Sequence, residues 1–313
     1  MSELPQRPPA FPGSRSSGET LYLAPSGRRF TDAYELEHEY AIEASVDDFE
    51  AVIGKMVDHS RRVRGELSGT FGLPYGPTVD ERLDVFPGPP GSPVVIFLHG
   101  GYWRAMSGED FSFVAAGLVG NATLVVPNYS LCPVASMDEI VRQHRAAIAW
   151  TYRNIADFGG NPDRIAVVGH SAGAHGVAMV LLTQWVENYG LPTDIIKGAC
   201  LISGIYDLRP LPYTSVQADL RLTADQVVRN SPILTPPATA PPILVTLGSE
   251  QTSEFIRQSA DLHGAWTAAG LQSRYWLRDG VDHFNELDAL AQPDSRLVSA
   301  IVGLCDAELP AQL

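Results

Sequence analysis

Cysteine is scarce in this sequence, and the three cysteines that occur, Cys132, Cys200 and Cys305, lie far apart. An odd number of cysteines without any CxxC spacing argues against both a disulfide framework and a zinc site. We therefore expect no bound metal. Cys200 lies within an apolar run and is predicted to be a small buried hydrophobic residue.

Positively charged residues are also few. The chain holds 22 lysines and arginines against 36 aspartates and glutamates, so its formal net charge at pH 7 is -14. A nucleic-acid-binding protein needs a basic surface, and no nucleic-acid partner is therefore expected. The acidic balance otherwise indicates only good solubility.

Long apolar runs are absent as well. The longest, around residues 177–182, is far shorter than the roughly 20 residues that cross a membrane. The N-terminus has three prolines within residues 1–9 and lacks the apolar segment of a secretory signal. The sequence thus predicts a cytoplasmic protein with a small-molecule substrate and no membrane partner. It leaves the oligomeric state open, with a homodimer among the options.

The N-terminal region differs in composition from the rest of the chain. Residues 1–30 are rich in Pro, Gly, Ser and Arg and are expected to form a flexible arm. Residues 33–67 carry apolar side chains at three- and four-residue steps, which predicts a helical segment. Residues 31–313 have a length that suits a single domain. Within it, a long Pro-rich connection at about residues 204–241 predicts a small cap over one end of a sheet.

From residue 81 onward, short apolar runs alternate with longer segments of helical periodicity. Several runs are apolar throughout, which is typical of strands buried on both faces of a sheet. Such alternation indicates an α/β protein with a doubly wound, mostly parallel sheet. The expected strands are residues 82–86, 94–98, 123–126, 164–168, 199–202, 243–247 and 274–277, and the expected helices are residues 109–119, 137–157, 173–187, 253–269 and 286–304.

The sequence GHSAG, residues 169–173, stands between a predicted strand and a predicted helix. In that setting GxSxG is typical of a sharp turn that exposes the serine hydroxyl at the carboxyl edge of the sheet. A Gly-rich turn without function is the alternative, but few such turns lie between a strand and a helix. We therefore predict that Ser171 is the nucleophile of a serine hydrolase with the α/β-hydrolase fold.

A second motif, HGGYW at residues 99–103, follows an early predicted strand. Acyl transfer needs backbone N–H groups directed at a developing oxyanion, and glycines present them without obstruction by side chains. Gly100, Gly101 and the amide of Ala172 are therefore the candidate oxyanion hole. His99 is expected to order the loop rather than to take part in the chemistry.

A serine hydroxyl also needs a base at neutral pH. In the α/β-hydrolase fold the catalytic histidine comes last in chain order. His283 follows the last predicted strand and fits that place, whereas His263 falls inside a predicted helix and His170 adjoins the nucleophile. His283 is thus the candidate base.

These motifs together resemble the kynurenine formamidase (arylformamidase) family, in the esterase/lipase branch of the α/β-hydrolases. The resemblance covers about residues 35–305 and implies hydrolysis of N-formylkynurenine to kynurenine and formate without a cofactor. It is more specific for the branch than for the substrate. The matching residues are HGGYW, GHSAG, Asn128-Tyr129, the segment 254–259 and the final Asp-His-Phe at 282–284.

The third member of the triad is where this sequence departs from the family. The resemblance implies an Asp or Glu three residues before the Glu-Phe pair, and Gln251 occupies that position. Glu250, one residue earlier, is favoured as the acid, with Glu254 and a site without any conventional acid as the alternatives. A glutamine cannot stabilise an imidazolium by charge. If Gln251 faces His283, a slow or altered enzyme is expected.

Aromatic residues near the predicted site suit an aryl substrate. Tyr102, Trp103 and Phe284 are the candidate substrate-binding residues, with Trp103 expected to line the pocket; core packing is the alternative role for each. The sequence favours a hydrolase that cleaves an N-formyl or other aryl amide through an acyl-enzyme. A carboxylesterase of the same branch and a non-catalytic ligand-binding protein on the same fold are the competing interpretations.

Overall fold

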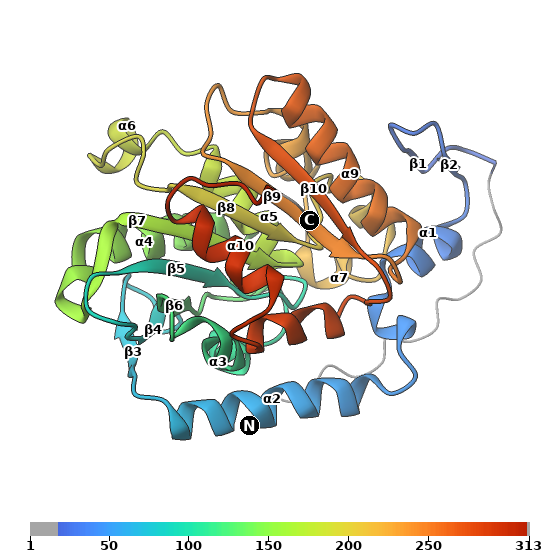
Figure 1. Ribbon diagram of the computed structural model, residues 1–313. Coiled ribbons are helices and arrows are strands. Elements are labelled where there is room, and N and C mark those ends of the chain that lie inside the picture. The colour runs from blue at the N-terminus through green and yellow to red at the C-terminus, as the bar shows by residue number, and fades with distance from the viewer. Residues whose placement is uncertain (1–17, 312–313) are drawn as a thin grey trace.

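The computed structural model describes residues 18–311 and is built around an eight-stranded sheet with helices on both faces (Figure 1). The strand order is β10-β9-β8-β7-β5-β6-β4-β3, and only β3 and β4 run antiparallel to their neighbours. The predicted α/β class with a mostly parallel sheet is therefore confirmed. The strands are β3 (Thr70–Pro74), β4 (Arg82–Phe86), β5 (Ser92–Leu98), β6 (Thr123–Pro127), β7 (Gly160–His170), β8 (Gly198–Ile202), β9 (Ile243–Gly248) and β10 (Ser273–Arg278).

All seven predicted strands are present, and β3 is the strand of the eight-stranded sheet that the sequence missed. Its sequence, Thr-Phe-Gly-Leu-Pro, contains the residues that usually punctuate a chain. It forms because it pairs with β4 at the edge of the sheet, where Gly and Pro are tolerated.

Helices cover both faces of the sheet at the expected places, with two breaks. The predicted helix 173–187 ends at Leu181 and resumes at Trp185, and the predicted helix 286–304 is interrupted around Pro293. The α-helices are α1 (Ala33–Tyr40), α2 (Phe49–Glu66), α3 (Ala115–Leu118), α4 (Met137–Asn154), α5 (Ala172–Leu181), α6 (Trp185–Tyr189), α7 (Gln217–Leu220), α8 (Ala224–Arg229), α9 (Ser253–Ala268) and α10 (Arg296–Leu304). The main 3₁₀ turns are η2 (Gly108–Val114) and η6 (Asn285–Ala291).

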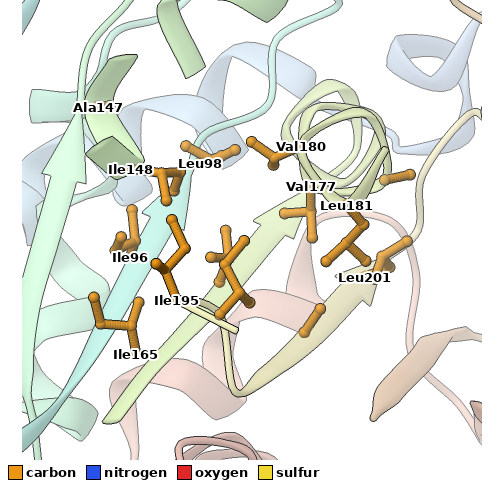
Figure 2. Packing of buried hydrophobic residues seen from close by; sticks show 14 of the residues in the cluster. Ile96, Leu98, Ala147, Ile148, Ile165, Val177, Val180, Leu181, Ile195 and Leu201 are labelled. Atoms are coloured by element: carbon orange, nitrogen blue, oxygen red, sulfur yellow. The ribbon is translucent and has the colours of Figure 1, made fainter. Parts of the chain in front are cut away.

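The central strands are buried on both faces, which explains their uninterrupted apolar sequences. Ile96 and Leu98 of β5 pack on one face with α4 and α5, whereas Val95 and Phe97 pack on the other with α10. Figure 2 shows the first of these layers, with the side chains of β5, β7 and β8 directed at α5. Successive side chains of a strand point to opposite faces, so each strand supplies both layers.

The expected flexible arm over residues 1–30 needs correction in its described part. Residues 1–17 lie outside the described residues, but residues 18–30 include a small antiparallel pair, β1 (Tyr22–Leu23) and β2 (Arg29–Phe30). Tyr22 and Phe30 are buried, and the Tyr22 hydroxyl donates a 2.8 Å hydrogen bond to Asp207. Aromatic burial and this bond attach the segment to the domain, which composition alone did not reveal.

The order of the strands decides where a site can form. After β6 the chain crosses to the opposite side of β5 and enters as β7, so β5 and β7 are neighbours whose following loops diverge. In open α/β sheets, ligands bind in the crevice at such a switch point, beyond the carboxyl ends of the strands. The motifs at residues 99–103 and 169–173 lie at the ends of these two strands.

Candidate active site

Ser171 stands on a strained turn between β7 and α5. Its backbone angles are φ 55° and ψ -119°, a conformation that a non-glycine residue rarely adopts and that costs about 1–3 kcal/mol. The turn is held by its own backbone: the Ser171 N–H donates to the Ile202 carbonyl at 2.8 Å, and the Ser171 carbonyl accepts from Ala174 at 3.0 Å. Such a turn directs the serine side chain out of the strand and towards the crevice.

The two glycines of GHSAG are required by close backbone contacts. A Cβ on Gly169 would lie 2.3 Å from the Gly173 carbonyl oxygen. A Cβ on Gly173 would lie 2.0 Å from the Leu98 carbonyl oxygen. The start of α5 therefore packs directly against the ends of β5 and β7, and no side chain fits at either position.

His283 lies in the loop after β10, with its ring buried beside the nucleophile turn. Its Nδ1 is 3.1 Å from Oε1 of Gln251, and Nε2 of Gln251 donates to Oγ of Ser203 at 2.7 Å. The amide oxygen accepts, so Nδ1 carries the proton and Nε2 is the basic nitrogen. Nε2 is buried and has no hydrogen-bonding partner among the described residues. His283 and Ser171 line the same cavity.

Burial governs the protonation of this histidine. Loss of hydration, and secondly the nearby His170, hold the pKa of His283 well below its usual range. The imidazole is therefore neutral at neutral pH, as a general base must be. The same environment opposes the imidazolium that forms when the base accepts a proton.

Neither glutamate proposed for the triad meets His283, and the preference for Glu250 is corrected here. The Glu250 side chain is exposed and approaches only the adjacent Ser249 hydroxyl, at 3.3 Å. Glu254 is buried in α9 and forms an ion pair with Arg257 at 2.7 Å. The chain turns directly after β9 so that Gln251, the residue at the family's acid position, faces the histidine.

One buried carboxylate near His283 escaped the sequence analysis. Glu286 is fully buried, and its Oε2 pairs with Arg278 at 2.9 Å while its Oε1 lies 3.2 Å from Nε2 of His170. His170 Nε2 is also 3.0 Å from the His283 carbonyl oxygen. Glu286 lies in a segment of helical pattern, and a charged residue there is normally expected at the surface. Its pairing with Arg278 from β10, which makes burial tolerable, is not visible in the sequence.

Within residues 18–311, this cluster is also the one group of side chains close enough to hold a metal ion. The ligand atoms of His170, His283 and Glu286 all lie within 4.8 Å of one another. The carboxylate of this cluster is paired with Arg278.

The loop after β5 has an unusual backbone. Gly101 has φ 109°, and Tyr102 and Trp103 follow with φ 50° and 54°. His99 is buried, stacks on Tyr129 at 4.1 Å and lies with Nδ1 2.8 Å from the Gly100 carbonyl oxygen. The loop therefore turns sharply around a fixed imidazole.

The predicted oxyanion residues gather around Ser171. Gly100 packs against it, since a Cβ there would lie 3.2 Å from Ser171 Cβ, and Gly101 lines the cavity. Ala172 is the first residue of α5, where backbone N–H groups have no partner within the helix.

A cavity of about 330 Å³ opens over Ser171 and His283. Tyr102 and Phe284 line it as expected, but Trp103 does not: it is fully buried behind the loop with its ring against His175. The outer wall comes from α2, a segment for which the sequence suggested no role in the site. The apolar lining residues are Ile42, Phe49, Val52, Ile53, Met56, Ala105, Met106, Phe111, Phe113 and Leu287.

The expected cap at residues 204–241 contains α7 and α8 but does not cover this cavity. None of its residues is among those that line it. Its apolar side chains, including Leu208, Leu211 and Leu220, pack with α1 and the N-terminal pair of strands. The helix α2 lines the cavity instead and packs beside η2.

Comparison with known proteins agrees with this architecture. The profile of a family described as having the alpha/beta hydrolase fold matches residues 95–283. A solved structure from Silicibacter sp. TM1040, described as a candidate thioesterase, superposes with a TM-score of 0.72 at 28% identity and covers 85% of this chain and 98% of its own. The chain is therefore an α/β hydrolase.

Curated relatives indicate the family of α/β hydrolases to which the chain belongs. Kynurenine formamidase of Danio rerio is 33% identical over 268 residues, which span 82% of this chain and 89% of that protein. Kynurenine formamidase of Salmo salar is 34% identical over 269 residues, with 82% and 90% covered. The chain belongs to the kynurenine formamidase family. Within residues 18–311, no helix combines the length and apolarity needed to cross a membrane.

Proposed function

We propose that this protein is a serine hydrolase that cleaves an N-formyl or other aryl amide, such as N-formylkynurenine, through an acyl-enzyme at Ser171. The proposal depends on one observation: Ser171, on its strained turn, and His283 line the same cavity. The basic Nε2 of His283 has no hydrogen-bonding partner among the described residues. Membership of the kynurenine formamidase family supports the substrate class.

The proposed cycle uses only residues of this chain. Ser171 Oγ attacks the formyl carbon while His283 Nε2 takes its proton, and the amides near Gly100, Gly101 and Ala172 hold the oxyanion. Collapse of this intermediate breaks the C–N bond, and His283 returns the proton to the departing arylamine nitrogen. Water, deprotonated by His283, then attacks the formyl ester. When this second intermediate collapses, the C–O bond to Ser171 breaks, His283 returns the proton to Ser171 Oγ, and formate is released.

The shape of the cavity fits an aryl leaving group. Aromatic and aliphatic side chains from α2, η2 and the His283 loop, among them Phe49, Met56 and Phe284, form much of its wall. Charged and polar side chains also line it: Glu43, Lys55, His59, Arg104, Asp282, Asn285 and Asp288. Its volume of about 330 Å³ is at the lower end of the range for small-molecule sites. An aryl ring with a short polar substituent suits this combination of size and lining.

A carboxylesterase is the second candidate, and Gln251 is the observation in its favour. An aniline leaves only when protonated, which requires a well-populated imidazolium on His283. An activated ester expels a stable phenolate without that proton. Because Gln251 brings no charge to His283, ester cleavage is expected to suffer less than amide cleavage. A non-catalytic role is disfavoured because Ser171 and His283 line one cavity.

A substrate panel separates these functions. We expect wild-type protein to hydrolyse an N-formyl arylamine, with p-nitrophenyl acetate and a larger acylanilide for comparison, and Ser171→Ala to remove the activity while leaving the thermal unfolding midpoint unchanged. A fluorophosphonate probe should label Ser171. Turnover of esters alone would favour the carboxylesterase, and turnover that survives Ser171→Ala would refute the mechanism.

A further inference from the structure

The triad of this protein lacks its carboxylate, yet the imidazolium of His283 must still be stabilised. Gln251 supplies orientation, since its oxygen fixes the tautomer of the ring at 3.1 Å. It supplies no charge. The environment adds burial and a neighbouring histidine, both of which oppose protonation of His283. Another group must therefore stabilise the imidazolium if His283 is to accept and release a proton in each turnover.

The ionisable groups around His283 come from four elements. They are His170 at the end of β7, Asp282 and Glu286 in the loop and turn that follow β10, Arg278 in β10, and His59 and Asp288 across the cavity. Asp282 is directed at its own turn, where Oδ1 accepts the N–H groups of Phe284 and Asn285 at 2.7 and 2.8 Å. Glu286 is the carboxylate that is both buried and grouped with the histidine.

The position of Glu286 fits an electrostatic role. One of its oxygens lies within 4.8 Å of a ring nitrogen of His283. Its Oε1 accepts no hydrogen bond from the described residues and faces His170 at 3.2 Å. At such a separation a buried carboxylate attracts an imidazolium more strongly than it would in bulk water, and the Arg278 charge on its other oxygen offsets part of that attraction.

His170 links the two. Its Nε2 lies 3.0 Å from the His283 carbonyl oxygen, which accepts the Nε2 proton, and Glu286 Oε1 lies 3.2 Å from the same nitrogen as an ionic contact. The ring therefore holds the backbone of His283 and the carboxylate of Glu286 in a fixed relation. Arg278 anchors the other oxygen of Glu286 at 2.9 Å and donates a further bond to the Glu286 carbonyl at 2.9 Å.

We propose that Glu286, anchored by Arg278 and linked through His170, is the positioning residue that stabilises the protonated form of His283 in place of a triad carboxylate. Orientation and charge, which one acidic residue usually supplies, are thus divided between Gln251 and Glu286. This inference rests on the proposed serine-hydrolase function, and it holds for any acyl substrate.

A double-mutant cycle tests whether Gln251 supplies the orientation of His283 and Glu286 the charge. Glu286→Gln and Gln251→Glu are made singly and together, and kcat, KM and the pH dependence of kcat/KM are measured with whichever ester or amide is turned over. In the wild-type background, Glu286→Gln should lower kcat by about 10-fold or more with little change in KM, and should move the acidic limb of the profile to lower pH. In the Gln251→Glu background its effect should fall below about 3-fold, because a carboxylate then contacts Nδ1 directly.

An equal loss in both backgrounds, or an acidic limb that does not move, would overturn the proposal and leave Glu286 a purely structural residue. Because Glu286→Gln leaves Arg278 buried without a counter-charge, the variant Glu286→Gln/Arg278→Met, which removes both charges, is measured beside it. Wild-type kcat in a folded Glu286→Gln/Arg278→Met protein would also overturn the proposal.

The rate at which a fluorophosphonate labels Ser171 tests the role of Glu286 without requiring that the natural substrate be known. Labelling requires His283 as base but no amide or ester. If wild-type protein fails to cleave the formyl arylamine, the proposed function fails, while the pH dependence of labelling in the four proteins still reports on Glu286. A labelling rate that is insensitive to Glu286→Gln at every pH would refute the positioning role.

Discussion

The amide oxygen of Gln251 lies 3.1 Å from Nδ1 of His283, at the place where a triad carboxylate would stand. The contact fixes the orientation and tautomer of the ring as a carboxylate would, because only an acceptor is needed for that. It leaves out the charge that favours the imidazolium. The geometry of the base is therefore complete, and its electrostatics depend on the surroundings.

Gln251→Glu should raise activity. The new carboxylate keeps the contact to Nδ1, and Ser203 Oγ, which now accepts from the amide at 2.7 Å, can donate to it instead. We expect kcat for an aryl amide to rise by about 10-fold, which corresponds to about 1.4 kcal/mol of transition-state stabilisation. Because a nearby negative charge raises the pKa of His283, the acidic limb of kcat/KM should move to higher pH.

Glu250→Gln is the matched control for that substitution. It exchanges a carboxylate for an amide at the adjacent residue, whose side chain is exposed and contacts Ser249. Kinetic constants within twofold of wild type are expected. A large loss of kcat in Glu250→Gln would restore Glu250 as the acid and contradict the arrangement seen here.

Buried histidines should make the fold sensitive to acid. Burial lowers the pKa of His99 and of His175 to about 4, and it holds the pKa of His144 well below its usual range. The unfolded chain binds these protons near pH 6.5, so the folded state loses stability as the pH falls from about 6.5 towards 4. His99 and His175 should each contribute roughly 2 kcal/mol of this loss at pH 5. Denaturant unfolding at pH 7 and at pH 5 measures it.

His144→Leu tests this assignment. Neither ring nitrogen of His144 has a hydrogen-bonding partner in the described part of the chain, so an apolar replacement loses no hydrogen bond. The variant should keep its stability at pH 7 and lose less than wild type at pH 5. His263→Gln, at a half-buried histidine whose pKa burial also lowers, should reduce the difference between the two pH values by less than His144→Leu does. Identical pH dependence in wild type and His144→Leu would show that His144 is not involved.

The turn at Ser171 should not accept a methyl group at Gly173. A Cβ there would overlap the Leu98 carbonyl oxygen, and the start of α5 cannot move without displacing β5. Gly173→Ala should therefore lower the free energy of unfolding by about 2–3 kcal/mol or more. Gly264→Ala, at an exposed position of α9 with open space around it, should instead be neutral or slightly stabilising. Equal unfolding midpoints for the two variants would contradict this account.

The wall that α2 contributes should affect substrate binding. Met56 lines the cavity, whereas Val57 on the same helix does not. Met56→Ala removes apolar contact surface and should raise KM for an aryl substrate by about 5- to 10-fold, with a smaller effect on kcat. Val57→Ala serves as the control and should leave KM unchanged. If both substitutions alter KM equally, α2 acts through its overall packing and not as a binding surface.

The local sequence determined the strands, the serine turn and the histidine that closes the site. Continuous apolar runs and a GxSxG between strand and helix depend on neighbours along the chain, so they could be read without coordinates. The tertiary structure decided the rest. The loop after β9 turns Gln251, not Glu250, towards His283, so the one-residue shift that would have placed Glu250 there does not occur.

Long-range contacts also placed Glu286 in the interior and α2 over the cavity. Glu286 is buried with Arg278, on the neighbouring β10, as its ion-pair partner. The helix α2 reaches the site because Phe49 packs against Phe284, 235 positions further along the chain, at a ring separation of 5.5 Å. The periodic pattern of residues 33–67 predicted a helix but not what that helix packs against, because the partners of a contact so distant in sequence are set by the tertiary fold. Sequence reasoning therefore proposed Ser171 and His283 but missed both Glu286 beside them and the α2 wall of the cavity.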